Sequence, residues 1–110
     1  MRMWAVSPSI LCDKHLLGEH VEMHMFAGTI RKGISIKGYL DKHLVNPRGI
    51  AKRHEALKKE MKKRGMNHRS PLLLDCSQLP EAFVSTKKNL KDLLSRCPKC
   101  RENYENNICR

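Results

Sequence analysis

Long apolar runs are absent from this chain of 110 residues, and none approaches the roughly 18–20 apolar residues that a membrane-spanning helix needs. Aromatic residues are also few, with two Phe, two Tyr and one Trp. Leucine, isoleucine and methionine must therefore fill most of the one modest core that a chain of this length can build. The short apolar start is interrupted at Ser7-Pro8 and is no signal peptide. We expect one domain over residues 1–110, in a cytoplasmic protein without membrane contact, which would be associated with the nucleoid if its source is prokaryotic or viral.

Acidic residues are half as frequent as basic ones, with 11 Asp and Glu against 22 Lys and Arg, which gives a formal net charge of +11. Self-repulsion among so many cations destabilises a compact chain, so the excess indicates a polyanionic partner. Nucleic acid is the usual partner of this kind, because its binding releases condensed counterions. A ribosomal or merely basic protein would carry the same charge. Composition therefore selects the class of partner and not the activity.

Cysteines are five in number, and this odd and scattered set fits reduced thiols better than a disulfide framework. Cys97-x-x-Cys100 and Cys109 lie near the carboxyl end, and Cys76 or a histidine could complete a structural zinc site with them. One such pair is a weak signal, because a zinc ribbon carries two. Unligated thiols are the simpler interpretation, and we expect neither a metal nor another cofactor.

Helix signals predict the first helix from Ser7-Pro8 or Asp13 to about Lys32, with Gly33 as its stop. Residues 33–47 lack a clean period and predict an ordered loop with a turn of helix at most.

A second helix is predicted from Asn46-Pro47 to Gly65. Its core-facing stripe is formed by Ile50, His54, Leu57 and Met61. Residues 66–79 are expected to be loop, and a third helix is predicted from about residues 79–81 to Cys97-Pro98. Residues 97–110 are expected to form an irregular, Cys-containing tail. Because no strand is convincing, we predict an all-α domain of three helices with the N-terminal segment packed against them.

Residues 13–23 place titratable side chains at helical spacing within an apolar framework. His15, Glu19 and Glu22 stand at i, i+4 and i+7 and would form one stripe on a helix. The packing surface is expected to come from Leu16, Leu17, Val21, Met23, Met25 and Phe26. A solvated polar stripe is the commoner explanation of such a pattern, so the spacing alone leaves open whether it is a site.

His20 and His24 also stand at i, i+4, which is a spacing able to bind zinc. Glu22 lies between them and off their shared face, unlike the Glu of a zinc-protease helix. Metal catalysis is therefore not expected.

Several segments, taken in their order along the chain, are similar to those of a known protein family. Asp13-Lys14-His15-Leu16-Leu17-Gly18-Glu19-His20-Val21-Glu22 contains an Asp, a His-Leu pair and two Glu. Four further segments follow it along the chain: Gly28 with Arg31-Lys32, Lys52-Arg53, Lys63-Arg64-Gly65-Met66-Asn67 and Asp75-Cys76-Ser77-Gln78-Leu79-Pro80-Glu81-Ala82-Phe83. With these segments the chain resembles the phage-type pyrimidine-dimer DNA glycosylases with abasic-site lyase activity, the endonuclease V family of bacteriophage.

This resemblance implies that the α-amine of Met1 is the nucleophile and that Glu22 is the essential carboxylate. The bulk of Arg2 predicts that Met1 is retained, which keeps the family's spacing between the amine and Glu22. DNA contacts are expected at Arg2, His15, Arg31, Lys32, Lys87, Lys88 and Lys91. An α-amine titrates near about 7.7–8.0, against about 10.4 for lysine, so more of it is neutral and reactive at pH 7.

The activity that the resemblance implies is metal-independent DNA repair on damaged double-stranded DNA by a monomer, through a Schiff base to the sugar. A non-catalytic, basic nucleic-acid-binding protein of the same fold is the alternative, and it needs neither a free Met1 amine nor Glu22. Two family arginines near the catalytic Glu are replaced here by Val21 and Met25, and the family's aromatic C-terminal segment is replaced by residues 97–104. Damage preference could therefore differ.

Overall fold

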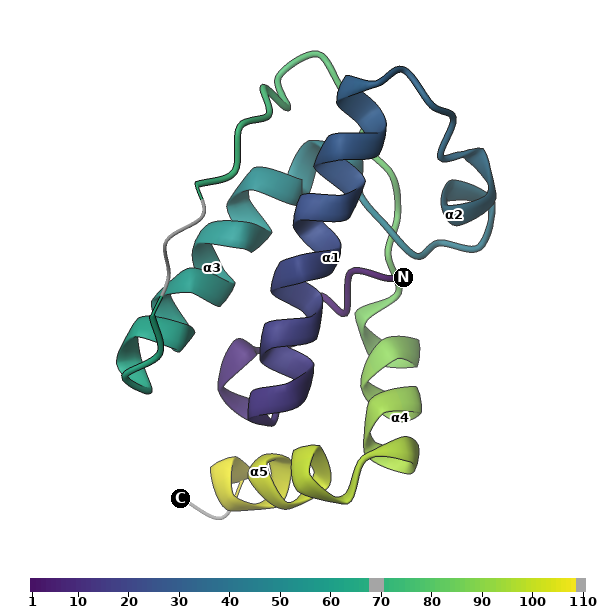
Figure 1. Cartoon of the computed structure of the whole chain (residues 1–110). Coiled ribbons are helices and arrows are strands. Elements are labelled where there is room, and N and C mark those ends of the chain that lie inside the picture. Colours follow the sequence, from purple (N-terminus) through teal and green to yellow (C-terminus); the bar gives the residue numbers. More distant parts are fainter. Residues whose placement is uncertain (68–70, 109–110) are drawn as a thin grey trace.

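The computed structural model describes residues 1–67 and 71–108, and helices are its only regular elements within those ranges (Figure 1). In chain order they are η1 (Pro8–Ile10), α1 (Asp13–Arg31), α2 (Lys37–Asp41), η2 (Pro47–Gly49), α3 (Ile50–Lys63), α4 (Thr86–Arg96) and α5 (Pro98–Ile108), where η marks a 3₁₀ turn. The expected all-α class is confirmed. The five-residue α2 is the turn of helix allowed for residues 33–47, whereas α5 is a helix that was not predicted.

Helix α1 begins at the second of its two predicted starts. Ser7-Pro8 initiates only the 3₁₀ turn η1, whereas the side chain of Cys12 caps α1 by accepting a hydrogen bond from the backbone N–H of His15. The helix ends at Arg31, and Gly33 follows with a φ of 71°. Glycine adopts this left-handed conformation without strain, which explains the stop at the predicted position.

One face of α1 packs, but it is narrower than the sequence pattern suggested. Leu16, Met23 and Phe26 are fully buried, as expected. Three other residues expected in the packing surface are instead exposed: Leu17 by 43%, Val21 by 53% and Met25 by 51%. They recur every fourth residue, so they share one side of the helix, and that side faces solvent.

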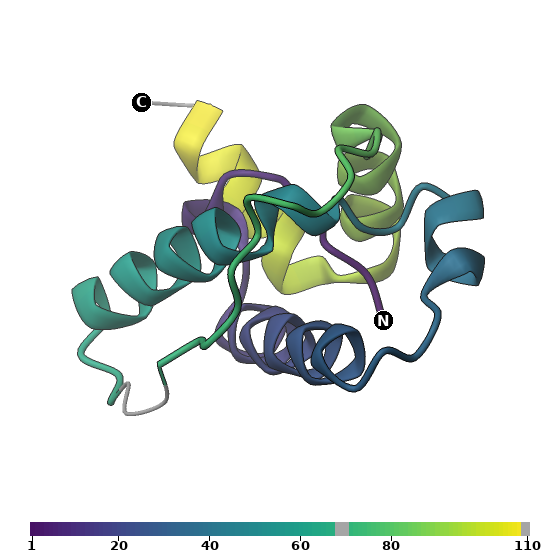
Figure 2. The same ribbon diagram turned by 90° about the horizontal axis from the view of Figure 1, so that it is seen from above.

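Helices α1 and α3 lie side by side and form the main helix pair (Figure 1, Figure 2). The predicted core stripe of α3 is confirmed, since Ile50, His54, Leu57 and Met61 are all buried. The Asn46-Pro47 signal starts η2, and α3 proper begins three residues later than Pro47, at Ile50. Asn46 does not cap the helix, because its side chain is engaged elsewhere. Its amide nitrogen donates to the Glu81 carboxylate at 3.2 Å, and its amide oxygen accepts from the backbone N–H of Ala82 at 3.1 Å.

The third predicted helix starts later than expected, at Thr86. The side chain of Ser85 caps α4 by accepting a hydrogen bond from the N–H of Lys88 at 3.2 Å. The preceding chain, from residue 71 to residue 85, has no regular structure. It is held to the helices by side chains such as Arg31, which donates to the carbonyl of Leu73 at 2.8 Å.

Residues expected to be an irregular tail form helix α5 instead. The Cys97-Pro98 step does end α4, but Pro98 then occupies the first turn of the next helix, where proline is tolerated. Helix α5 packs on η1, and the side chain of Asn103 donates to the carbonyl of Ile10 at 3.3 Å. Cys100 is fully buried, so the tail contributes to the core. Cys109 lies outside the described residues. Among those described, no helix is long and apolar enough to cross a membrane.

Candidate functional site

The N-terminal segment, residues 1–6, runs between α1 and α4, and the amino terminus lies beside the middle of α1 (Figure 1). Its backbone is held from two sides. The N–H of Met3 donates to the carbonyl of Leu44 at 2.7 Å, and the side chain of Asn89 donates to the carbonyls of Met3 and Trp4 at 3.1 and 2.9 Å. Asn89 is only 3% exposed. The position of the first residues is therefore fixed by hydrogen bonds to α4 and to the loop before η2.

This arrangement places Glu22 next to the backbone that joins Met1 to Arg2. The backbone N–H of Arg2 donates to Oε2 of Glu22 at 3.4 Å, and the side chain of Met1 is partly buried against the core. The α-amine belongs to the residue next to that N–H, so it lies in the neighbourhood of the Glu22 carboxylate. Glu22 itself is half-buried near the middle of α1, on a rigid element. A positioned carboxylate beside a primary amine can stabilise a cation or transfer a proton.

Arg2 is directed into the protein rather than into solvent. Its Nη1 atom lies 3.2 Å from Oδ1 of Asn89 and 3.2 Å from Oδ2 of Asp92, both on α4. The guanidinium also stacks on the ring of Trp4, at 4.4 Å from its centroid. The charge-assisted hydrogen bonds anchor the terminus to α4, and the cation–π contact holds the guanidinium against the N-terminal segment itself. The predicted contact of Arg2 with DNA stays a prediction.

Glu19 is the structural carboxylate of the predicted stripe. It is 1% exposed and receives two hydrogen bonds from Arg53 of α3, at 2.5 and 2.8 Å. Burial raises the pKa of the Glu19 carboxyl, and the hydrogen bonds from Arg53 oppose that shift only in part. Arg53 also donates to the carbonyl of Val6 at 2.7 Å. Glu19 therefore joins α1, α3 and the N-terminal segment, and it is not a second acid beside Glu22.

Most of the cations predicted to bind DNA are exposed. Lys32 follows the end of α1, and three lysines cover the first half of α4: Lys87, Lys88 and Lys91. Arg31 is also exposed, but its guanidinium holds the carbonyl of Leu73. The α4 lysines are sequence neighbours of Asn89 and Asp92, which hold the N-terminal segment. One helix thus combines the anchor of the terminus with a group of exposed positive charges.

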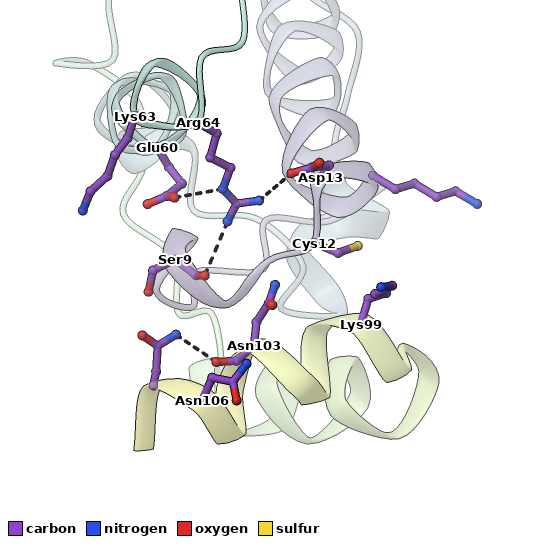
Figure 3. Close-up of a pocket in the computed structure, with 11 residues that line it drawn as sticks. Ser9, Cys12, Asp13, Glu60, Lys63, Arg64, Lys99, Asn103 and Asn106 are labelled. Atoms are coloured by element: carbon purple, nitrogen blue, oxygen red, sulfur yellow. Dashed lines mark hydrogen bonds and ion pairs between the residues drawn. The ribbon is translucent and has the colours of Figure 1, made fainter. Parts of the chain in front are cut away.

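A hollow lined mainly by polar side chains lies elsewhere. It has a volume of about 720 Å³ and is bounded by the start of α1, the end of α3 and α5 (Figure 3). Arg64 crosses it, donating to Glu60 at 2.9 Å, to Asp13 at 3.0 Å and to the carbonyl of Pro8 at 3.2 Å. Neither Met1 nor Glu22 lines this hollow. It is therefore distinct from the candidate catalytic pair.

His15 lies in a cluster with three thiols rather than beside Met1. Its Nδ1 atom is 3.1 Å from the sulfur of Cys12 and 3.6 Å from that of Cys100. The sulfur of Cys12 is in turn 3.8 Å from that of Cys97. Burial, reinforced by Lys14, lowers the pKa of His15, and burial raises the pKa of the Cys100 thiol to about 12. The predicted contact of His15 with DNA stays a prediction.

The histidine pair predicted on α1 meets a third histidine from α3. The rings of His20, His24 and His54 have centroids 4.8 to 4.9 Å apart, and His20 and His54 are buried. Because α1 and α3 pack at this level, the three rings form part of the contact between the two helices.

Two functional side chains on α4 were not predicted from the sequence. Asn89 and Asp92 fix the N-terminal segment, yet they lie on a helix that stands out in the sequence only by its charge. The one signal for them was the polar Asn89 one turn before the buried Leu93, on the core-facing side of α4. Cys12 was not predicted either, because its partners in the thiol cluster stand far along the chain.

Comparison with known proteins finds a family match for the first part of the chain. A family model described as pyrimidine dimer DNA glycosylase matches residues 1–74. The matched region holds the N-terminal segment, α1, α2 and α3, including Met1 and Glu22, and it ends before α4. No curated protein and no solved structure matches the chain.

Proposed function

Because the chain belongs to the pyrimidine dimer DNA glycosylase family, we propose that it excises a damaged base from duplex DNA and then cuts the strand by an abasic-site lyase step. The observation that carries the proposal is the 3.4 Å hydrogen bond from the Arg2 N–H to Glu22, which supports a reactive pair of the Met1 amine and the Glu22 carboxylate. The substrate is duplex DNA that contains an ultraviolet-induced pyrimidine dimer, and the protein acts as a monomer wherever the cell keeps its DNA.

The first chemical step is nucleophilic. The neutral α-amine of Met1 attacks C1′ of the damaged nucleoside, the C1′–N bond to the base breaks, and its electron pair leaves with the base, which takes up a proton. After the nitrogen loses a proton, the C1′–O4′ bond breaks, O4′ takes up a proton, and the product is a protonated imine, the Schiff base. Glu22 stabilises the positive charge that develops on the sugar during these steps.

Strand cleavage follows from the Schiff base. Removal of a proton from C2′ by Glu22 sends an electron pair toward the cationic imine and expels the 3′ phosphate by β-elimination. Each step balances with the amine, a carboxylate and water alone, so the proposal names no metal and no other cofactor. Hydrolysis of the imine finally releases Met1.

Access to C1′ requires a distorted duplex, which costs a few kcal/mol and less at a damaged site. We assign part of the compensating attraction to the exposed Lys32, Lys87, Lys88 and Lys91, which would contact backbone phosphates. Arg2, Arg31 and His15 make contacts within the protein, and any contact of theirs with DNA would be additional to those.

The second candidate function is binding to damaged DNA without cleavage. The net charge of +11 favours it as much as it favours the enzyme. The two functions differ in whether the protein forms a covalent bond, so borohydride trapping separates them.

The experiment incubates the protein with an abasic duplex and with an ultraviolet-irradiated duplex in the presence of borohydride, which reduces a Schiff base to a stable adduct. We expect adducts with both duplexes and none after selective acetylation of the α-amine. Binding without an adduct on either duplex would favour the non-catalytic alternative. Because the mechanism needs a free Met1 amine, the intact mass of the active protein should correspond to a chain that begins with unmodified Met1.

A further inference from the structure

Four side chains with metal-binding atoms meet where the start of α1 lies against the junction of α4 and α5. They are Cys12, His15, Cys97 and Cys100, here called the Cys₃His cluster, and their donor atoms all lie within 4.8 Å of one another. We propose that the Cys₃His cluster binds one zinc ion as a structural site. The inference is independent of the proposed glycosylase chemistry, since no member of the cluster forms or breaks a bond in it.

The spacing of the donor atoms fits a single tetrahedral ion. With Zn–S bonds near 2.3 Å and Zn–N bonds near 2.0–2.1 Å, the edges of the tetrahedron are about 3.8 Å between sulfurs and about 3.5 Å between sulfur and nitrogen. The Cys12 and Cys97 sulfurs are 3.8 Å apart, and Nδ1 of His15 lies 3.1 and 3.6 Å from the sulfurs of Cys12 and Cys100. The other distances between donor atoms are at most 4.8 Å, so shifts of up to about 1 Å would complete the geometry.

Backbone N–H groups already surround the sulfurs as they do in thiolate metal sites. The N–H of His15 donates to Cys12 at 3.4 Å, that of Cys100 donates to Cys97 at 3.4 Å, and that of Cys12 donates to Cys100 at 3.2 Å. Each sulfur therefore accepts one N–H. Such outer hydrogen bonds orient the ligands and offset the negative charge of thiolates.

The chemistry of the ligands selects zinc and a structural role. Three sulfurs and one imidazole suit a borderline-soft, tetrahedral ion, whereas Mg²⁺ and Ca²⁺ require oxygen ligands. A full set of four protein ligands leaves no open position for water or substrate, which is the mark of a structural site.

A dithiol pair for redox chemistry would explain less of the arrangement. It would need only Cys97 and Cys100, and it would give no reason for the approach of Cys12 and His15. Once the fold is known, the four side chains can be recognised in the sequence as two pairs of equal spacing, Cys12-x-x-His15 and Cys97-x-x-Cys100. The two pairs stand far apart in the chain, and the fold brings them together into one candidate site.

The ion would add a link between two parts of the molecule that the packing of α5 on η1 already brings together. Cys12 and His15 belong to the start of α1, whereas Cys97 and Cys100 belong to the α4–α5 junction. Figure 3 shows Cys12 near the first turn of α5, which carries Lys99. Trp4 links the cluster to the N-terminal segment, since its ring centroid is 6.0 Å from that of His15 and 4.4 Å from the Arg2 guanidinium. Zinc would thereby support the segment that carries Met1.

The test measures metal content and coordination on the whole protein, produced in zinc-supplemented medium and kept reduced. We expect one zinc per chain. Replacement by Co²⁺ should give the strong visible bands of a tetrahedral ion together with sulfur-to-cobalt charge transfer in the near ultraviolet. Cobalt held by His20, His24 and His54 would lack the charge-transfer band, so the unmodified protein alone distinguishes the two clusters.

Variants then identify the ligands. The double variant Cys97→Ser/Cys100→Ser should lose the ion almost completely, and its melting temperature should fall by roughly 10 °C or more. Cys76→Ser is the matched control, because Cys76 lies outside the cluster, and it should keep one zinc per chain. His15→Cys should also keep the ion with a stronger charge-transfer band, whereas His15→Ala should weaken binding.

Several results would overturn the proposal. They are a zinc content far below one per chain in the reduced protein, a cobalt spectrum without sulfur charge transfer, retention of zinc by Cys97→Ser/Cys100→Ser, and a disulfide within the cluster in the protein as isolated from cells.

Discussion

Residues 1–74 and the pair of helices α4 and α5 differ in what they contribute to this molecule. The first region matches the family and contains both proposed reacting groups, Met1 and Glu22. The second region lies outside the match, yet its Asn89 and Asp92 hold the N-terminal segment in place. The proposed reacting groups and part of the structure that holds the N-terminal segment therefore belong to separate parts of the chain. Variants in each region should fail in different ways.

The largest effect is expected at Glu22. Glu22→Gln keeps the size of the side chain but removes the charge and the base, so strand nicking should fall by roughly 10²–10⁴-fold. Binding to the same duplex should change little, because α1 keeps its packing. Single-turnover nicking and a gel-shift titration measure the two quantities. Glu105→Gln, an exposed carboxylate on α5, is the matched control and should retain full nicking. A Glu22→Gln protein that still nicks at the normal rate would refute the role given to Glu22.

A loss of stability rather than of chemistry is expected at Arg53. Arg53→Leu leaves the buried Glu19 carboxylate without its partner, which should lower the free energy of unfolding by about 3–5 kcal/mol near pH 7. The folded-state pKa of Glu19 is already above its ordinary value, and loss of Arg53 should raise it further. A carboxyl group with a raised folded pKa destabilises the fold as pH rises, so the deficit should shrink toward pH 4.5. Urea titrations at both pH values measure it.

The double variant Glu19→Leu/Arg53→Leu tests the cause of that loss. Removal of both charges should be less harmful than removal of Arg53 alone, because no uncompensated carboxylate stays buried. Equal or greater destabilisation of the double variant would show that the pair is not the reason for the deficit.

An intermediate effect is expected where the two regions meet. Asn89→Ala leaves the carbonyls of Met3 and Trp4 without their donor, which should cost about 1–3 kcal/mol. Lyase turnover should fall further than stability explains, because the Met1 amine is no longer held in a fixed position. Denaturant unfolding and nicking rates at a temperature where the variant is folded separate the two losses. Asn107→Ala, which removes an exposed hydrogen bond on α5, should leave both unchanged.

The smallest effect is expected from the α4 lysines. Lys87→Gln/Lys88→Gln/Lys91→Gln should weaken binding and reduce the slope of log K against log salt by roughly 0.9 for each phosphate that the variant no longer neutralises. The matched control changes three exposed lysines of α3, Lys52, Lys59 and Lys62, in the same way. Equal slopes for the two triple variants would show that α4 makes no special contact with the backbone.

Features that depend on local sequence signals could be predicted, whereas features that depend on contacts between distant residues could not. The core stripe of α3 was predictable from its helical spacing, and the end of α1 from Gly33, because both signals are local. Helix α5 was not predictable, because Cys97-Pro98 is a stop signal that here ends one helix and begins another. The contact of α5 with η1, which stabilises it, lies far away in the sequence. The exposure of Leu17, Val21 and Met25 depends on which side of α1 the other elements cover.

In the candidate site, too, local signals were predictable and long-range contacts were not. Glu22 and Met1 could be proposed from a resemblance confined to local motifs. The structural role of Glu19 could not be predicted, because its partner Arg53 lies on α3. Asn89 and the Cys12–His15 half of the Cys₃His cluster depend on contacts between residues more than 80 positions apart. Spacing along the chain carries no information about such pairs.

The most direct measurement identifies the residue that carries the sugar after borohydride reduction of the complex with an abasic duplex. We predict that peptide mapping by mass spectrometry finds the sugar on the α-amine of Met1 and nowhere else. A sugar found on a lysine side chain, with the Met1 amine free, would contradict the proposed chemistry.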